Sequence, residues 1–185
     1  APSFSISIIR STPCKEYMQR GERECFMRIA VFSDSHGVKE PMLAAIEEQK
    51  PDMVLHLGDY VRDAEAIAAY FPSLDLRYVR GNCDAEVDQM VLDFPVMADY
   101  ATLFDETGRE LFLTHGHVFG AGMHNSVDHA PALPEGSALV YGHTHIKVNE
   151  ESAAHPGLWL FNPGSVSIPK DGTHSYGIYE GGAFR

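Results

Sequence analysis

Short apolar runs alternate with amphipathic stretches through the first half of the chain. Arg28–Phe32, Met53–Leu57 and Leu76–Val79 are bounded by turn residues, as is typical of buried strands. Between them, Pro41–Lys50 and Arg62–Phe71 each place apolar side chains on one helical face, and a proline opens the first and follows the second. This β-α-β-α-β order predicts parallel strands with helices packed on the sheet.

The second half carries short apolar runs without long helical patterns between them. These runs are Leu103–Phe104, Leu111–Thr114, Ala138–Tyr141, Leu158–Phe161 and Tyr176–Tyr179. Residues 120–136 show the weakest pattern, and we expect a loop there. A two-sheet α/β sandwich with helices outside accounts for the whole pattern better than one doubly wound sheet.

The length of 185 residues predicts one domain. Residues 1–26 mix a short apolar patch with scattered basic residues, and we interpret them as an N-terminal extension outside the core. Residues 27–185 then form the single domain. No stretch approaches the roughly 20 apolar residues of a membrane span, so no membrane partner is expected.

Net charge indicates the class of partner, and the cysteine content indicates the cellular location. Fourteen basic and 26 acidic residues give a formal net charge of −12, which disfavours long nucleic acid but allows a small anion at a locally positive site. Cys14, Cys25 and Cys83 form no CxxC pair, which favours a reducing, cytoplasmic location over a disulfide framework. The sequence leaves a homo-oligomer open.

Polar side chains that can bind metals follow six of the predicted strands. Since ligands of α/β sheets bind at the carboxyl ends of strands, we expect these side chains to meet. They are Asp34 and His36, Asp59, Asn82, His115 and His117, His143 and His145, and Asn162.

The mixture of ligand types indicates transition metals. Imidazole nitrogens with carboxylate and amide oxygens suit Mn, Fe, Co, Ni or Zn, and the set exceeds what one tetrahedral ion needs. Two ions about 3.5–4 Å apart can activate a water and hold phosphate oxygens, and Asp59, alone on its loop, is the natural bridge. Two divalent ions carry more positive charge than Asp34, Asp59 and a hydroxide cancel. The site can therefore attract a phosphate anion.

The motifs Asp34-x-His36, Gly58-Asp59, Gly81-Asn82, His115 and Gly142-His143-x-His145 resemble the signature of the calcineurin-like metallophosphoesterases. The strings around them, with Asn162–Ser167, resemble the small YfcE-type branch of bacterial phosphodiesterases. The resemblance implies a four-layer sandwich of two mixed β-sheets flanked by helices, and hydrolysis of phosphodiesters or phosphomonoesters, commonly with Mn(II). It also implies three ligand groups: Asp34, His36 and His145 for one ion, Asn82, His115 and His143 for the other, and Asp59 between them.

One position departs from the family pattern. Many relatives carry a histidine after the asparagine, where it can protonate the leaving group, whereas this chain carries Cys83. A thiol with a pKa of about 8.5 is a poor substitute. His117 is the nearest alternative acid in the sequence, and its other interpretation is that it orients a ligand.

We therefore expect a phosphoric diester hydrolase that acts on a small organic phosphodiester through a hydroxide bridging two divalent ions. Mn(II) is the expected metal, with Zn, Fe, Co or Ni as alternatives. Asn82 is expected to serve both as a ligand and in turnover. The alternative functions are a nucleotide pyrophosphatase or phosphomonoesterase of the same fold, and a non-catalytic scaffold. Among the remaining polar residues, we expect His56 to lie in the core and Asp84 to orient a ligand.

Overall fold

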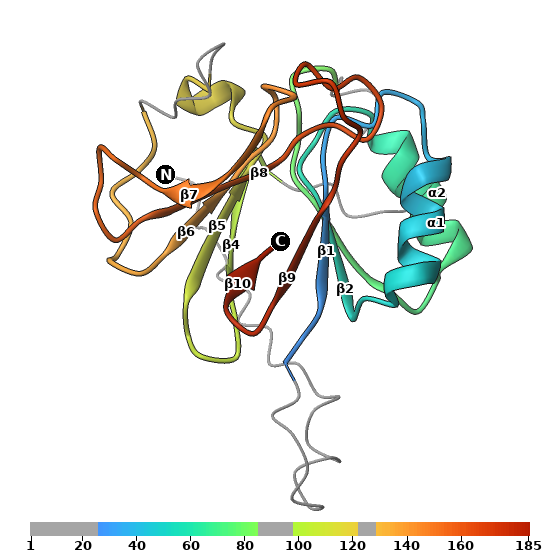
Figure 1. Ribbon diagram of the computed structural model, residues 1–185. Helices are drawn as coiled ribbons and strands as arrows, with labels where there is room; N and C mark the ends of the chain where they lie inside the picture. The colour runs from blue at the N-terminus through green and yellow to red at the C-terminus, as the bar shows by residue number, and fades with distance from the viewer. Residues whose placement is uncertain (1–25, 85–97, 122–128) are drawn as a thin grey trace, which may run out of the picture.

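The computed structural model describes residues 26–84, 98–121 and 129–185 (Figure 1). The predicted extension, apart from Phe26, lies outside these ranges, as does part of the expected loop at residues 120–136. The described remainder of that loop, at residues 120–121 and 129–136, contains no helix or strand. Within the described residues, no helix is both long and apolar enough to cross a membrane.

The first sheet has the strand order β10-β9-β1-β2-β3. Its strands are β1 (Ile29–Phe32), β2 (Met53–His56), β3 (Asp75–Tyr78), β9 (Gly177–Glu180) and β10 (Ala183–Phe184). Strands β1, β2 and β3 are parallel, as the alternating pattern predicts, and β9 pairs with β1 in the antiparallel direction. The carboxyl ends of the three parallel strands therefore point to the same edge.

The two predicted helices cover the outer face of this sheet (Figure 1). They are α1 (Glu40–Gln49) and α2 (Val61–Tyr70). Met42 and Ile46 of α1 and Ile67 of α2 are buried against Phe32 of the sheet. The apolar stripes read from the sequence thus become the packing faces.

The second sheet has the order β4-β5-β6-β8-β7. Its strands are β4 (Tyr100–Phe104), β5 (Glu110–Thr114), β6 (Ala138–Val140), β7 (Lys147–Glu151) and β8 (Trp159–Pro163). Strands β5, β6 and β8 are parallel, whereas β4 and β7 run antiparallel to their neighbours. The only described helix beyond β5 is a short 3-10 turn, η3 (His117–Phe119).

Strands β7 and β10 were not expected from the sequence. Strand β7 reads Lys-Val-Asn-Glu-Glu and is mostly exposed at the edge of its sheet. A polar edge strand carries no apolar alternation, and charged residues at an edge discourage pairing with other chains. Strand β10 has only two residues, Ala183 and Phe184, and its backbone pairing with β9 defines it.

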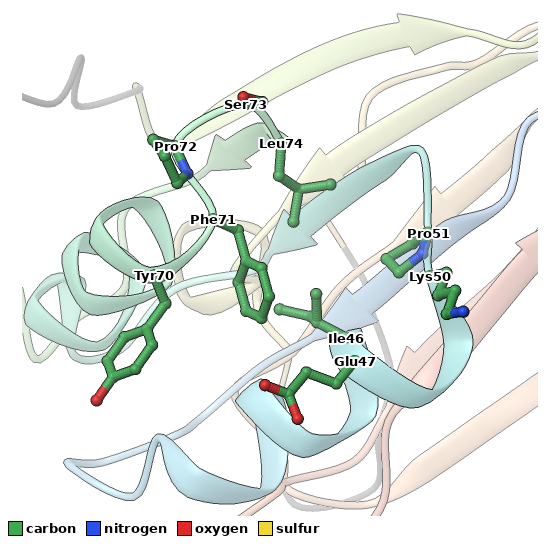
Figure 2. Close-up of a pocket in the computed structure, with 9 residues that line it drawn as sticks. All are labelled: Ile46, Glu47, Lys50, Pro51, Tyr70, Phe71, Pro72, Ser73 and Leu74. Carbon is green, nitrogen blue, oxygen red and sulfur yellow. The ribbon is translucent and has the colours of Figure 1, made fainter.

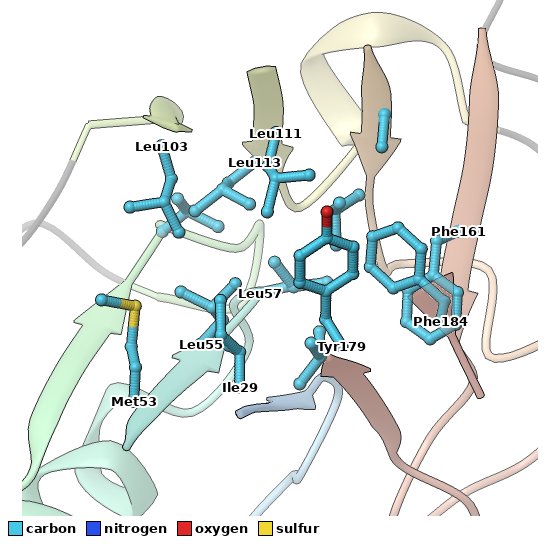
Figure 3. Close-up of a cluster of buried hydrophobic side chains, with 14 residues drawn as sticks. Ile29, Met53, Leu55, Leu57, Leu103, Leu111, Leu113, Phe161, Tyr179 and Phe184 are labelled. Atoms are coloured by element: carbon cyan, nitrogen blue, oxygen red, sulfur yellow. The ribbon is translucent and has the colours of Figure 1, made fainter. Parts of the chain in front are cut away.

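The two sheets face each other across a continuous apolar core (Figure 3). Leu111 and Leu113 of β5 point toward Leu55 of β2 and Tyr179 of β9. This packing confirms the α/β sandwich of two mixed sheets and rules out one doubly wound sheet.

Asp105, in the β4–β5 turn, links the two sheets. Its Oδ1 accepts hydrogen bonds from the backbone of Thr107 and Arg109 at 2.8 and 2.9 Å, and its Oδ2 accepts one from the Tyr179 hydroxyl at 2.6 Å. Burial alone raises the pKa of Asp105, but the hydrogen bonds from Tyr179 and the turn outweigh it and hold the pKa below its usual value. The ionised carboxylate therefore stabilises the fold.

Asp105→Asn is expected to lower the free energy of unfolding by about 1.5–3 kcal/mol at pH 7, because hydrogen bonds to a charged acceptor are lost. The wild-type advantage should be complete above the ordinary carboxyl pKa of 3.8 and vanish as the pH falls through the lower native pKa. Denaturant unfolding at several pH values measures both effects. The exposed neighbour Glu106→Gln is the control, and an advantage that grew toward acid pH would contradict this account.

Candidate metal centre

The predicted ligands gather where the strands of both sheets end. Asp34 and His36 follow β1, Asp59 follows β2, Asn82 follows β3, His115 follows β5, and His143 and His145 follow β6. Five of these residues have positive φ angles, and none of the five is a glycine: Asp34, His36, Asp59, His143 and His145. Left-handed backbone costs such residues roughly 1–2 kcal/mol each, and strain of this kind concentrates at functional sites.

Asp34 is fully buried at the centre of the group. Its Oδ2 accepts hydrogen bonds from Ser33 Oγ at 2.6 Å and from the His143 backbone N–H at 3.0 Å. Its Oδ1 has no hydrogen-bond donor of good geometry among the described residues. That oxygen instead faces Nε2 of His145 at 3.1 Å and Nε2 of His36 and His115, both at 3.9 Å.

The backbone fixes the tautomer of His145. Nδ1 lies 2.7 Å from the carbonyl oxygen of Ile168, which can only accept, so Nδ1 carries the proton. In a neutral ring, Nε2 then turns a lone pair toward the carboxylate of Asp34. A second proton can relieve this repulsion, and the neighbouring carboxylate of Asp34 accordingly raises the pKa of His145. A metal cation between the two atoms would relieve it equally well.

His115 is arranged in the same way. Its Nδ1 lies 2.7 Å from the carbonyl oxygen of Leu57, so Nε2 again presents a lone pair. That nitrogen faces Asn82 Oδ1 at 3.0 Å and Asp59 Oδ1 at 3.5 Å, both of which accept hydrogen bonds. Three acceptors converging without a donor between them are suited to a cation.

Asp59 turns its two oxygens toward the two halves of the group. Oδ1 lies 3.5 Å from His115 Nε2, and Oδ2 lies 3.7 Å from His36 Nε2. The backbone N–H of Cys83 donates to Oδ1 at 2.9 Å and holds the carboxylate in place. A carboxylate that bridges two ions must present one oxygen to each ion, as these positions allow.

The two remaining histidines, His36 and His143, differ in their contacts. Nε2 of His36 lies 3.4 Å from Nε2 of His145, so these imidazoles converge beside Asp34. The ring of His143 lies 5.1 Å from that of His115, centroid to centroid. The structure thus brings all seven predicted ligands into one region, with His143 the most loosely placed.

Residues around the ligands hold the loops. Asp84 accepts backbone N–H donors from Asp59, Val61 and Gly81, as well as the Tyr78 hydroxyl. This arrangement agrees with the expectation that Asp84 orients a ligand. The hydroxyls of Ser165 and Ser167 both donate to the Asp34 carbonyl at 2.8 Å.

Two residues beside the ligands, Asn162 and Ser33, have roles that the sequence did not predict. Asn162 lies within β8, not in a loop after a strand, and its Nδ2 donates to the Gly142 carbonyl at 2.9 Å. It holds the His143 loop from the neighbouring strand and does not join the ligands. Ser33 was not predicted to act at the site, although its place directly before Asp34 was a usable signal.

Three further polar residues that the sequence analysis discussed are His56, Cys83 and His117. His56 is buried as expected, beside Ser35 Oγ at 3.1 Å, and burial lowers its pKa to about 4. Burial and then Asp59 raise the pKa of Cys83 to about 11, so the thiol stays protonated at neutral pH. His117 lies in η3 with its ring 5.4 Å from that of His115, and burial followed by His115 lowers its pKa.

These residues have the donor atoms to hold divalent cations. The described donor atoms that lie within 4.8 Å of one another form three overlapping groups: Asp34, His36 and His145; Asp34, Asp59 and His115; and His36, Asp59 and Cys83. Imidazole and carboxylate donors suit Mn, Fe, Co, Ni and Zn. Asp34, His36 and Asp59 each belong to two of these groups, so two ions bound here would lie next to each other.

A separate hollow of about 480 Å³ lies between the carboxyl ends of α1 and α2. Figure 2 shows Ile46, Phe71 and Leu74 pointing into it, with Glu47 and Lys50 at its edge. Among the described residues that line it, Glu47 is the only carboxylate, and no histidine is present. This hollow does not have the chemistry of a metal centre.

Comparison with known proteins places these features in context. A family model described as the calcineurin-like phosphoesterase superfamily domain matches residues 27–181. Phosphodiesterase YfcE of Escherichia coli K12 is 50% identical over 171 aligned positions, which cover 83% of this chain and 88% of that protein. A probable metallophosphoesterase, YsnB of Bacillus subtilis, is 29% identical over 82% of this chain and 83% of its own length.

Comparison with solved structures agrees with the sequence comparison. The solved structure of the E. coli phosphoesterase YfcE superimposes with a TM-score of 0.69 over 82% of this chain and 87% of that one, with 36% identity among the superimposed residues.

Proposed function

This chain belongs to the calcineurin-like phosphoesterase superfamily and is a phosphodiesterase, and we propose that it hydrolyses small organic phosphodiesters at a dinuclear metal centre. The observation that carries the proposal is the buried Asp34 Oδ1, which has no hydrogen-bond donor of good geometry among the described residues and faces three imidazole Nε2 atoms. When bound, two divalent ions would supply the nucleophile, by lowering the pKa of a shared water, and would neutralise phosphate oxygens.

The chain itself prepares the centre. The carbonyls of Leu57 and Ile168 fix which nitrogen each imidazole presents, so His115 and His145 need no reorganisation to bind a metal. Asp34, His36 and His145 would hold one ion, and Asn82, His115 and His143 the other. Asp59 would join both, because its two oxygens already face the two halves.

Asn82 has a second task in this proposal. Its Oδ1 faces His115 Nε2, and among the described residues the amide Nδ2 has only the weak acceptor Cys83 Sγ, at 3.5 Å. The exposed amide can therefore donate a hydrogen bond to a phosphate oxygen as negative charge grows there. This donor is the reason that we place Asn82 among the catalytic residues.

His117 is our candidate for the proton donor to the leaving group. Its ring lies 6.2 Å from His143 and 5.4 Å from His115, close enough to reach a bound substrate. Because its pKa is lowered, only a minority of the free protein carries the proton at pH 7. Substrates whose leaving groups need no proton should therefore react best, which agrees with the high pKa of Cys83.

The remaining features indicate a small substrate. The net charge of −12 opposes a long polyanion, and the positive charge of bound ions is confined to the site. We propose Mn(II) as the resident metal and the reducing cytosol as the place of action.

Metal removal tests the function. Exhaustive chelation should abolish hydrolysis of bis-p-nitrophenyl phosphate, and Mn(II) should restore it with two ions per chain, because nucleophile and charge neutralisation both depend on the ions. Nitrophenolate release and elemental analysis measure the two quantities.

The His143→Ala variant should lose this activity. The His155→Ala variant should keep it, because His155 is an exposed histidine in the β7–β8 turn. Full activity without metal would refute the proposal. Two bound ions without hydrolysis of any phosphoester tested would point instead to a scaffold.

A further inference from the structure

Exposed apolar side chains lie on the loops that carry the candidate metal ligands. Four of the large apolar side chains that the described structure leaves exposed lie on loops carrying candidate ligands or residues next to them: Val38, Tyr60, Val118 and Ile168, which are 40–54% exposed. Val38 follows His36 by two residues, Val118 adjoins His117, and the carbonyl of Ile168 binds His145 Nδ1.

Tyr60 is the largest of these side chains and the closest to the metal centre along the chain. It directly follows Asp59, and its ring lies 5.6 Å from the imidazole of His36 in an edge-to-face arrangement. Its ring carbon also lies 3.5 Å from the position of a β-carbon built on Gly37, so the ring lies over the β1 loop. With 45% of its surface exposed, the ring keeps room for another contact.

The backbone holds this ring in place at a cost. Tyr60 has a φ of +74°, a left-handed conformation that is unfavourable for a bulky residue. Hydrogen bonds on either side of the peptide maintain it, since the Asp63 N–H donates to the Tyr60 carbonyl at 2.9 Å and the Val61 N–H donates to Asp84 Oδ1 at 2.9 Å. Asparagine or glycine would fit this backbone with less strain, so the start of α2 does not require an aromatic ring.

We infer that Tyr60 is a specificity-determining residue that stacks on an aromatic or heteroaromatic group in the ester arm that stays on phosphorus when the leaving group departs. This inference rests on the proposed function, because the metal centre fixes the phosphate from which the arm extends. A planar arm would bury apolar surface on an exposed ring that is already ordered, so little conformational entropy would be lost on binding. The preferred substrate class is therefore a phosphodiester whose retained arm carries a nucleoside or aryl group, in preference to one whose retained arm is aliphatic.

Two substrates with the same leaving group isolate this contact. They are the p-nitrophenyl ester of adenosine 5′-monophosphate and methyl p-nitrophenyl phosphate, and in each water displaces p-nitrophenolate from phosphorus. Tyr60→Ala should lower kcat/KM for the adenosine ester about tenfold, as expected for the loss of one stacked base, and change it less than about twofold for the methyl ester. Tyr60→Phe should retain the preference.

Tyr70→Ala is the matched control, because Tyr70 is an exposed tyrosine at the far end of α2, the helix that Tyr60 precedes. An equal loss for both substrates would mean that Tyr60 only supports the backbone and would overturn the inference. No loss for either would also overturn it.

Binding of adenosine 5′-monophosphate to the Mn(II)-loaded protein, measured by calorimetry, gives a test that does not depend on turnover. Tyr60→Ala should weaken binding about tenfold, and Tyr60→Phe and Tyr70→Ala should not. If the wild-type protein hydrolyses neither ester, the proposed function fails, yet this binding pattern would still support Tyr60. Unchanged or absent binding overturns the inference in either case.

Discussion

Asp59→Asn is expected to reduce kcat on bis-p-nitrophenyl phosphate by about 10³-fold or more, beyond the 10²–10³ typical of losing one transition-state donor. The amide removes one negative charge and one of the two oxygens that face His115 and His36, at 3.5 and 3.7 Å. A bridge needs both oxygens, so the variant should retain at most one tightly bound ion per chain. Steady-state kinetics and metal analysis after dialysis measure both losses.

The matched control for this substitution is Asp75→Asn. Asp75 lies on β3 and pairs with Arg77 at 2.8 Å at a half-exposed position away from the metal centre. Its loss should leave turnover within about twofold and stability within about 1 kcal/mol, as for other surface ion pairs. Two tightly bound ions in Asp59→Asn, or activity equal to that of Asp75→Asn, would remove Asp59 from the bridging position.

Gly81→Ala is expected to lower activity at least about 10²-fold, because misplacement of a catalytic group by about an ångström can have an effect of this size. A β-carbon at this position would overlap both Oδ1 and the backbone nitrogen of Asp59. Rotation of the Asp59 side chain cannot remove the contact with the nitrogen. The β2 and β3 loops must therefore separate, which should also lower the free energy of unfolding by about 1–3 kcal/mol.

Kinetics and denaturant unfolding test this variant against Gly136→Ala. Gly136 has a φ of +87° and open space around its α-carbon, at the start of β6 and far from the ligands. That control should lose some stability through backbone strain alone and keep its activity. If both variants kept activity, the close approach of Gly81 to Asp59 would have no catalytic importance.

The sequence alone determined much of this protein. Apolar periods placed β1, α1, β2, α2 and β3 within one or two residues, because local periodicity records which side of an element faces the core. The order of ligands after strands indicated a metal centre before any distance was known, since parallel strands end at a common edge. Strand β7 was missed because its stability comes from pairing with β8 and not from its own pattern.

Only the tertiary structure decided how the donors are used. Nothing local to His115 shows that the carbonyl of Leu57, 58 residues away, selects its tautomer, or that Ser165 and Ser167 hold the backbone of Asp34. The same holds for Asp84, which ties the loop after β2 to its own loop after β3, and for Tyr60, whose ring packs edge-to-face against His36. Such contacts arise between segments that are distant in the chain, so they depend on how the strands and sheets are arranged and not on the residues beside them.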